Sequence, residues 1–268
     1  MNILKIPFFI SLALLTGYCY ADDSSQKINE LIGEWRVTAV QLDNEATTST
    51  GTTINDPHYI GRKVVINRES INGNLDKSVN CSYPQYQLNN TISLDKLIES
   101  TSGKRHVAPQ NPKAEDYGLK AQNVLPVSVV CKEGKFGPKG ENIGNWVALL
   151  ERNTLITNWY DNSYLVMKRI QINEKISPSF SCHASLNPTE KTICSNNELA
   201  SWDNSVNQAY KTLVMQQQKI MPDDKATLNK IKATQMNWLK KRNQCKADTD
   251  CIEKAMKDRV DTITQQFM

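Results

Sequence analysis

The spacing of apolar residues changes once along this chain, from a period of two to a period of three to four. As far as residue 170, apolar and polar positions alternate in short segments rich in β-branched and aromatic residues. This alternation predicts strands in the following segments: 35–42, 63–67, 127–131, 145–150, 154–158 and 164–170. Turn-forming residues separate them at 72–74, 132–134 and 161–162. Because the last three strands are closely spaced, we expect them to form an antiparallel meander.

Between the first and second of these turns the pattern is weaker. A single short helix is expected at 94–100, followed by a long polar loop at 102–120 that contains two prolines. The first part of the chain is therefore predicted to be mainly β-structure.

Helical spacing begins after residue 181. The segments 187–190 and 195–198 each place a capping residue three positions before a glutamate, which is typical of a helix start. Two long helices and a third, weaker one follow from apolar or seam positions at steps of three and four: Leu199, Trp202, Val206, Tyr210 and Leu213; Leu228, Ile231, Gln235, Trp238 and Arg242; and Ile252, Ala255, Met256, Arg259 and Ile263. Residues 222–224 reverse the chain between the two long helices, which predicts an antiparallel hairpin.

The N-terminal segment is typical of an export signal. Lys5 is followed by an apolar run at 6–15, and residues 19–21 form a small-x-small cleavage site before Asp22. The run is too short to cross a membrane, and no later segment reaches the ~18 apolar residues that a crossing needs. We therefore expect an exported, periplasmic protein that does not span the membrane. Lipidation of Cys19 is disfavoured because bulky Tyr18 precedes it.

Six cysteines remain after this signal, and an even number in an exported chain favours disulfides. Cys81 and Cys131 are the two cysteines of the β-rich part and are expected to pair. In the helical part, antiparallel packing would bring four cysteines to one end of the hairpin. We favour the nested pairs Cys194–Cys245 and Cys182–Cys251, although the spacing also allows the crossed arrangement.

The β-rich part resembles a small lipocalin-like barrel. The resemblance rests on Gly33-Glu34-Trp35 at the first strand and Arg169 on the last one. It implies that Trp35 closes the barrel floor and that Arg169 packs across its face, a favourable cation–π contact. The interior is expected to hold Trp35, Val37, Val129, Val147 and Leu149, either as a filled core or as a ligand pocket.

The fold class is therefore α+β with two domains. A signal peptide at 1–21 precedes a small antiparallel β-barrel at 22–175, and a linker at 176–181 leads to a disulfide-stapled helical domain at 182–268. Residues 22–181 carry 18 basic and 18 acidic residues, and residues 182–268 carry 13 basic and 10 acidic residues. Neither part is basic enough to indicate nucleic-acid binding.

The sequence gives little support for catalysis. It contains no Gly-x-Ser-x-Gly elbow, no His-Glu-x-x-His motif and no phosphate-binding glycine loop. With three scattered histidines and no C-x2-C pair, we expect neither a catalytic residue nor a metal site or cofactor. His58, in an Asp-Pro-His turn, is interpreted as a surface residue.

One residue pattern in the helical part resembles a known family. It runs in order through Cys182, Glu190, Ile193, Cys194, Leu199, Asp203, Tyr210, Gln235, Trp238, Arg242, Cys245, Cys251 and Arg259. In this order and spacing it is similar to the LprI family, exported bacterial proteins associated with lysozyme inhibition, over about a third of the chain. Asn243 departs from the pattern, because the family commonly places an aspartate there, and this puts a local carboxylate–cation contact in doubt.

The resemblance implies binding to a lysozyme or another peptidoglycan hydrolase. We interpret Asp203, Tyr210, Gln235, Trp238 and Arg242 as internal, with Trp238 against Trp202 and with Gln235 and Arg242 paired to Asp203 and Glu198. The alternative is that Trp238 or Arg242 contacts the target directly.

On the outer face of the second helix, Lys240 and Lys241 are the candidate partner-binding residues, since a basic side chain could pair with the catalytic carboxylates of a glycosidase. A solvated face is the simpler interpretation, and animal-type lysozymes are strongly basic, so long-range steering would favour an acidic inhibitor. Two other functions compete with inhibition of lysozyme: an envelope-binding protein whose barrel holds an apolar ligand, and an immunity protein against a rival's cell-wall hydrolase.

Overall fold

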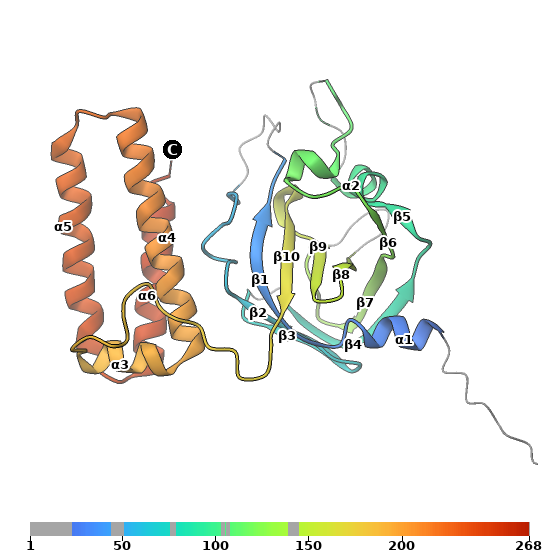
Figure 1. Cartoon of the computed structure of the whole chain (residues 1–268), viewed down its shortest axis with the longest axis horizontal. Coiled ribbons are helices and arrows are strands. Elements are labelled where there is room, and N and C mark those ends of the chain that lie inside the picture. Colours follow the sequence, from blue (N-terminus) through green and yellow to red (C-terminus); the bar gives the residue numbers. More distant parts are fainter. Residues whose placement is uncertain are drawn as a thin grey trace, which may run out of the picture.

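The protein consists of a β-barrel and a group of helices that lie side by side (Figure 1). The computed structural model describes residues 23–43, 51–75, 79–102, 105, 108–138 and 145–267. The predicted signal peptide, including Cys19, lies outside these residues. A short helix α1 (Asp23–Asn29), which the sequence pattern did not predict, leads into the first strand.

Eight antiparallel strands close into a barrel in the order β1-β10-β9-β8-β7-β4-β3-β2. Their bounds are β1 Gly33–Gln41, β2 Lys63–Ile66, β3 Ser70–Gly73, β4 Asn80–Leu88, β7 Val127–Glu133, β8 Trp146–Glu151, β9 Thr154–Asn158 and β10 Tyr164–Arg169. The six predicted strands are present with ends shifted by at most two residues, and β8, β9 and β10 form the predicted meander.

Two barrel strands, β3 and β4, were not predicted. Residues 72–74 were predicted to be a turn, but Asn72 and Gly73 belong to β3, where they pair with Val65 and Val64 of β2. A side chain at Gly73 would meet the carbonyl oxygen of Lys63 at 2.5 Å, so glycine here serves the close approach of two strands. β4 was missed because its sequence, NCSYPQYQL, contains a proline and many polar residues, which weaken the strand signal.

The barrel interior contains the expected residues. Trp35, Val37, Val129 and Val147 are buried in one apolar cluster, and partly buried Leu149 packs against it. The guanidinium carbon of Arg169 lies 4.1 Å from the Trp35 ring centroid, as the resemblance to lipocalin-like barrels implied. The described side chains of this cluster thus pack as a core, which is the usual state of an eight-stranded barrel of this size.

One outer face of the barrel is also covered. Helix α2 (Leu94–Ser102), the 3-10 helix η1 (Ala114–Tyr117) and the two-stranded sheet of β5 (Ile92–Ser93) and β6 (Asn123–Val124) supply most of a second apolar cluster with Trp146 and Tyr164. A further 3-10 helix, η2 (Tyr160–Asn162), forms the predicted turn before β10. Helix α2 confirms the helix expected at 94–100, with an end two residues later.

The C-terminal part contains α3 (Pro188–Ser195), α4 (Asn197–Ile220), α5 (Lys225–Arg242), η3 (Asn243–Cys245) and α6 (Thr249–Thr264). Asn187 and Glu190 form the predicted capping box at α3. At α4 the capping residue is Asn196, one position after the predicted Ser195. Asp224 caps α5 within the predicted reversal.

The contributions of α5 and α6 to the apolar core differ from the prediction. Helix α6 was expected to be the weaker one, yet it buries Ile252, Met256, Val260 and Ile263 against α4. Helix α5 buries only Ile231 and Arg242. The cause is the composition of α5, because its seam contains polar Gln235 and Arg242. Most of the apolar surface that packs against α4 therefore comes from α6.

The three disulfides join Cys81 to Cys131, Cys182 to Cys194 and Cys245 to Cys251. The first pair confirms the prediction. The nested pairs, Cys194–Cys245 and Cys182–Cys251, are wrong, and so is the crossed arrangement. All four helical cysteines do lie near one end, where the Thr189 hydroxyl donates to the Asn243 carbonyl at 3.2 Å. However, each pair joins cysteines that are close in sequence, with Cα–Cα distances of 5.9 and 5.6 Å.

The barrel and the helices are in direct contact. Arg62, which immediately precedes β2, is fully buried against α4, and its Nη2 donates to the hydroxyls of Ser201 and Ser205 at 3.0 and 3.1 Å. On the same side, the Gln208 side chain of α4 donates to the Asn55 carbonyl at 2.6 Å. These contacts fix the helices against one wall of the barrel.

Candidate functional site

A cleft between α4 and α5 gathers the five residues of the LprI-like pattern that we interpreted as internal. Its volume is about 500 Å³, and its walls include Asp203 and Tyr210 from α4 and Gln235, Trp238 and Arg242 from α5. Helical spacing explains the arrangement, because residues at steps of three, four and seven share one helix face. The sequence therefore placed five residues on two facing helices, and the structure brings them to one site.

A buried ion pair forms one wall of this cleft. Arg242 Nη1 lies 3.1 Å from Asp203 Oδ1, and both side chains are almost inaccessible to solvent. Burial lowers the pKa of Arg242, while the charges of Asp203 and Glu190 oppose that shift. The pair confirms the expected contact between Arg242 and Asp203, and it ties the end of α5 to the first half of α4.

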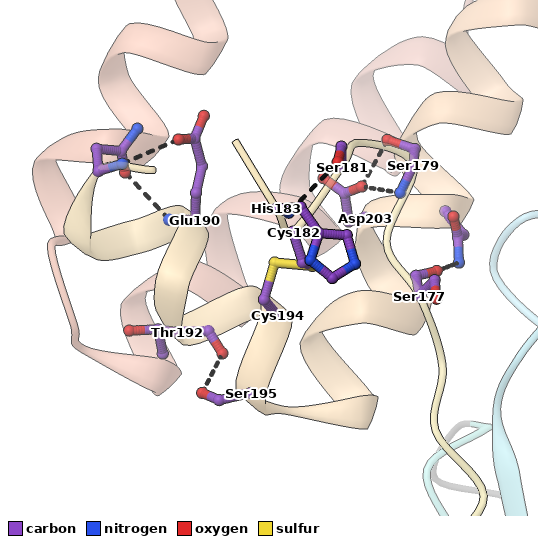
Figure 2. The surroundings of a disulfide bond; sticks show 12 residues. Ser177, Ser179, Ser181, Cys182, His183, Glu190, Thr192, Cys194, Ser195 and Asp203 are labelled. Atoms are coloured by element: carbon purple, nitrogen blue, oxygen red, sulfur yellow. Dashed lines mark hydrogen bonds between the residues drawn. A yellow bond between two sulfur atoms is a disulfide. The ribbon is translucent and has the colours of Figure 1, made fainter. Parts of the chain in front are cut away.

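The same carboxylate also holds the chain that enters the helical part. Asp203 Oδ2 accepts from the backbone N–H and the hydroxyl of Ser179, at 2.8 and 2.6 Å (Figure 2). In this view the Cys182–Cys194 disulfide joins the chain just after Ser179 to helix α3. Asp203 is thus an internal junction of three segments, which agrees with its structural interpretation.

Asn243 preserves the contact that its departure from the family pattern put in doubt. Its side-chain oxygen accepts from Nε and Nη2 of Arg242, at 3.2 and 3.0 Å. An amide oxygen can accept these bonds as a carboxylate would, although without the charge. The local geometry is therefore retained with a neutral partner.

The partners of Gln235 and Glu198 differ from those predicted. Gln235 Oε1 accepts from Nε and Nη2 of Arg259 on α6, at 3.0 and 2.8 Å. Glu198 faces the barrel, with Oε1 3.5 Å from Arg62 Nη1. The prediction considered only the two long helices, and the missing partners came from α6 and from the barrel.

Trp238 is a half-buried link between these polar residues. Its ring centroid lies 5.4 Å from the guanidinium carbon of Arg242 and 5.8 Å from that of Arg259. Its indole N–H donates to the Ala255 carbonyl of α6 at 3.2 Å. Trp238 packs against the apolar cluster that includes Trp202. Its polar atom is therefore satisfied inside the helical part.

Several polar groups in the cleft have no hydrogen-bond partner among the described residues. They are the hydroxyl of Tyr210, the side chain of Asn207, the ammonium of Lys232 and the amide nitrogen of Gln235. Beside them lie the apolar side chains of Phe180, Val206, Met236 and Leu239. Hydrogen-bond donors above an apolar floor are a common composition of sites that take a side chain of a partner.

Asn207 and Lys232 were not predicted as cleft residues. Each could have been found from spacing, since Asn207 follows Asp203 by one helical turn and Lys232 precedes Gln235 by three residues. Phe180 had no such signal, because it comes from the segment before the helices and reaches the cleft only through the fold.

The candidate partner-binding residues Lys240 and Lys241 lie at the end of α5 near this cleft but do not line it. Both are exposed, and neither forms an ion pair within the described residues. In the same part of the chain, no group of three or more His, Cys, Asp and Glu residues is placed to hold a metal ion. None of the described helices combines the length and apolarity that a membrane crossing needs.

Comparison with protein-family models gives a match in the helical part. Residues 182–266 match the model of a protein family described as "Lysozyme inhibitor LprI". The match begins at Cys182 and ends within three residues of the C-terminus, so it covers α3 to α6 and leaves the barrel outside. No curated protein and no solved structure matches the chain significantly.

Proposed function

We propose that this protein is an exported inhibitor that binds a lysozyme or a related muramidase through its helical part. The observation that carries the proposal is the family match over residues 182–266, and six of the thirteen residues of the LprI-like pattern line one cleft between α4 and α5. In this proposal the chain divides into a signal peptide at 1–21, a barrel domain at 22–175, a linker at 176–181 and the inhibitory domain at 182–268.

Binding, rather than chemistry, is the proposed mode of action. Glycosidases that cleave cell-wall polysaccharide use two carboxyl groups beside the scissile bond. A basic side chain of the inhibitor placed near those groups would exclude substrate and gain a charge-assisted contact. Lys240 and Lys241 are the proposed contacts, because they are exposed, unpaired in the described structure and located beside the cleft. Disulfides and the family match support export to the periplasm.

The barrel is proposed as a scaffold in this mechanism. Its described interior side chains pack as one apolar cluster, which favours a filled core over a ligand pocket. The barrel contacts the inhibitory domain at α4, through Arg62, and this contact leaves α5 uncovered. An immunity protein against a rival's cell-wall hydrolase would use the same face and differ only in its target.

The test uses the full mature chain with its disulfides oxidised. Inhibition of cell-wall lysis and direct binding would be measured together against a panel of muramidases. We expect one-to-one binding with a Kd on the order of 1 µM or tighter for at least one enzyme. The variant Lys240→Ala/Lys241→Ala should weaken it, whereas Lys96→Ala/Lys120→Ala, on the barrel, should not. Absence of binding and inhibition across the panel would refute the proposal.

A further inference from the structure

Helix α5 carries all of the positive charge excess of the helical part. It contains five lysines and one arginine and no acidic residue. Residues 182–268 hold 13 basic and 10 acidic residues in total, so the rest of this part has seven basic against ten acidic residues. The charge is therefore concentrated on one helix and is not spread over the surface.

The lysines cover the solvent side of α5. The seam residues Leu228, Ile231, Gln235, Trp238 and Arg242 face α4 and α6, and at about 100° per residue the five lysines fall on the remaining arc: Lys225, Lys230, Lys232, Lys240 and Lys241. All five are exposed, and none forms an ion pair within the described residues. They extend along about 24 Å of helix at 1.5 Å per residue. We call this surface the α5 cationic face.

This face is unobstructed. Helix α5 is the outermost helix, with α4 between it and the barrel and α6 behind (Figure 1). Its main contacts are with α4, α6 and η3. A partner could therefore approach the full length of the α5 cationic face without meeting the barrel.

One lysine connects the face to the cleft. Lys232 belongs to the α5 cationic face and also lines the cleft, next to the unpartnered groups of Asn207, Tyr210 and Gln235. A cleft that combines an apolar floor, polar groups without partners and a charged, accessible rim has the composition of a protein-binding site, in which an anchor side chain is buried and charges surround it.

We infer that the α5 cationic face and the adjoining cleft together form the partner-binding site, and that its partner is an acidic hydrolase. This inference rests on the proposed function and specifies its target class. A protein of net negative charge, with an acidic rim around its substrate groove, is steered onto the lysines, and an acceptor-bearing side chain of its surface enters the cleft. A strongly basic animal-type lysozyme is repelled at long range by the same lysines.

A protein partner fits the face better than a lipid surface does. Helices that lie on membranes present a broad apolar side to the acyl chains. On α5 the apolar residues are turned toward α4 and α6, and the residues between the lysines are small or polar, with Met236 as the large exposed exception. The cleft also contains hydrogen-bond donors with fixed directions. The mobile headgroups of a lipid surface would not form specific hydrogen bonds with them.

The experiment compares two muramidases of one fold, one strongly basic and one acidic at pH 7, with the full oxidised chain. Association rates would be measured at several salt concentrations for the wild type and for Lys230→Glu/Lys232→Glu/Lys240→Glu/Lys241→Glu. The matched control, with the same charge change on exposed barrel lysines, is Lys96→Glu/Lys120→Glu/Lys135→Glu/Lys168→Glu. A second variant, Tyr210→Phe, removes only a hydroxyl that forms no hydrogen bond within the described structure. Thermal unfolding would confirm that each variant is folded.

We expect faster, salt-sensitive association with the acidic enzyme. Charge reversal on α5 should slow it by about tenfold or more at low salt, whereas the barrel control should change it by less than about threefold. Tyr210→Phe should raise the dissociation rate without changing stability. Equal or stronger binding of the basic enzyme would overturn this inference and leave the proposed function intact, whereas failure to bind either enzyme would refute both. Binding to anionic phospholipid vesicles that depends on the α5 lysines, without binding to the acidic enzyme, would also overturn it.

Discussion

The guanidinium carbon of Arg62 lies 3.4 Å from the ring centroid of Trp202, and this contact joins the barrel to the helices. Arg62 is fully buried, and burial lowers its pKa to about 10, while the charges of Glu198 and Glu253 oppose the shift. The group is therefore still charged at neutral pH. A buried cation stacked on an indole and bonded to two serines holds the two parts in one relative position.

Arg62→Ala should destabilise the whole protein. It leaves Glu198 without its facing cation, removes one donor from each of the hydroxyls of Ser201 and Ser205, and opens a space beside Trp202. We expect a loss of about 3 kcal/mol in the free energy of unfolding, at the low end of the range for breaking a buried ion pair, because Glu198 remains partly solvated. Urea denaturation followed by tryptophan fluorescence would measure it.

Arg36 provides the control for Arg62, since it also belongs to the barrel and pairs with Glu174 at 3.0 Å in a less buried place. Arg36→Ala should cost about 1 kcal/mol, as expected for a partly exposed pair. If Arg62→Ala cost no more than Arg36→Ala, the contact with Trp202 would not hold the two parts together.

The Asp203–Arg242 pair should show strong energetic coupling. Asp203→Asn and Arg242→Met should each lower the free energy of unfolding by about 3 kcal/mol or more, because each leaves a buried polar partner uncompensated. The double variant should cost less than the sum of the two, with a coupling energy of about 1–3 kcal/mol. Lys241→Met, at the exposed neighbouring position, should change stability by less than about 0.5 kcal/mol. Additive single effects would argue against a direct pair.

The disulfide pairing can be read from a non-reducing tryptic digest. Cleavage after Lys191 separates Cys182 from Cys194, and cleavage after Lys246 separates Cys245 from Cys251. Mass spectrometry should therefore find the peptides of Cys182 and Cys194 linked, and those of Cys245 and Cys251 linked. Linkage of Cys194 to Cys245 would instead restore the nested pairs.

Serine replacements of each pair should then differ in cost. The pairs span 50, 12 and 6 residues, and the chain-entropy model gives stabilisation of about 4, 3 and 2 kcal/mol. The largest effect is expected for Cys81–Cys131, which joins the paired strands β4 and β7. Equal losses for the three pairs would show that chain entropy is not the main contribution.

His58 should make the contact between barrel and helices sensitive to pH. Its Nδ1 lies 2.6 Å from Asp56 Oδ1, and its Nε2 lies 3.0 Å from Asp261 Oδ1 on α6. Burial lowers the pKa of His58, but the hydrogen bonds and charges of the two carboxylates outweigh burial and raise it above 6.5. The net result is that folding favours the protonated imidazole.

The sign of the pH effect follows from this shift. The contribution of His58 is fully present below about pH 6.5 and is lost as pH rises through the raised pKa. His58→Gln should therefore reduce stability at pH 5.5 and have a smaller effect at pH 9. The side chain is more than a third exposed, so solvent screening should keep the difference below about 1 kcal/mol. Thermal unfolding of both proteins at the two pH values measures it, and a loss that grows with pH would contradict the assignment.

Local pattern was sufficient for most elements of the fold. Alternation predicted six of the eight barrel strands, and Asn187 and Glu190 formed the capping box that their spacing indicated. The pairing of Arg242 with Asp203 was also predictable, since each residue lies on the inner face of its helix. These features depend on the spacing of residues within one helix or one strand, and this spacing can be read directly from the sequence.

Features that depend on a third element were not predictable in this way. Gln235 pairs with Arg259, and Glu198 lies near Arg62, because α6 and the barrel pack against the helices that carry them. His58, interpreted from sequence as a surface turn residue, joins Asp56 to Asp261. In each case the partner is distant in sequence, so helical or strand period gives no signal for it.

The sequence by itself determined the change from β-structure to helices, the capping residues, the motif faces of α4 and α5, and the positive charge of α5. The tertiary structure decided which strands close the barrel, which cysteines pair, and how Arg62 and His58 attach the helices to the barrel. Periodicity and charge are properties of neighbouring residues, whereas closure and pairing are selected by which distant segments can be buried together.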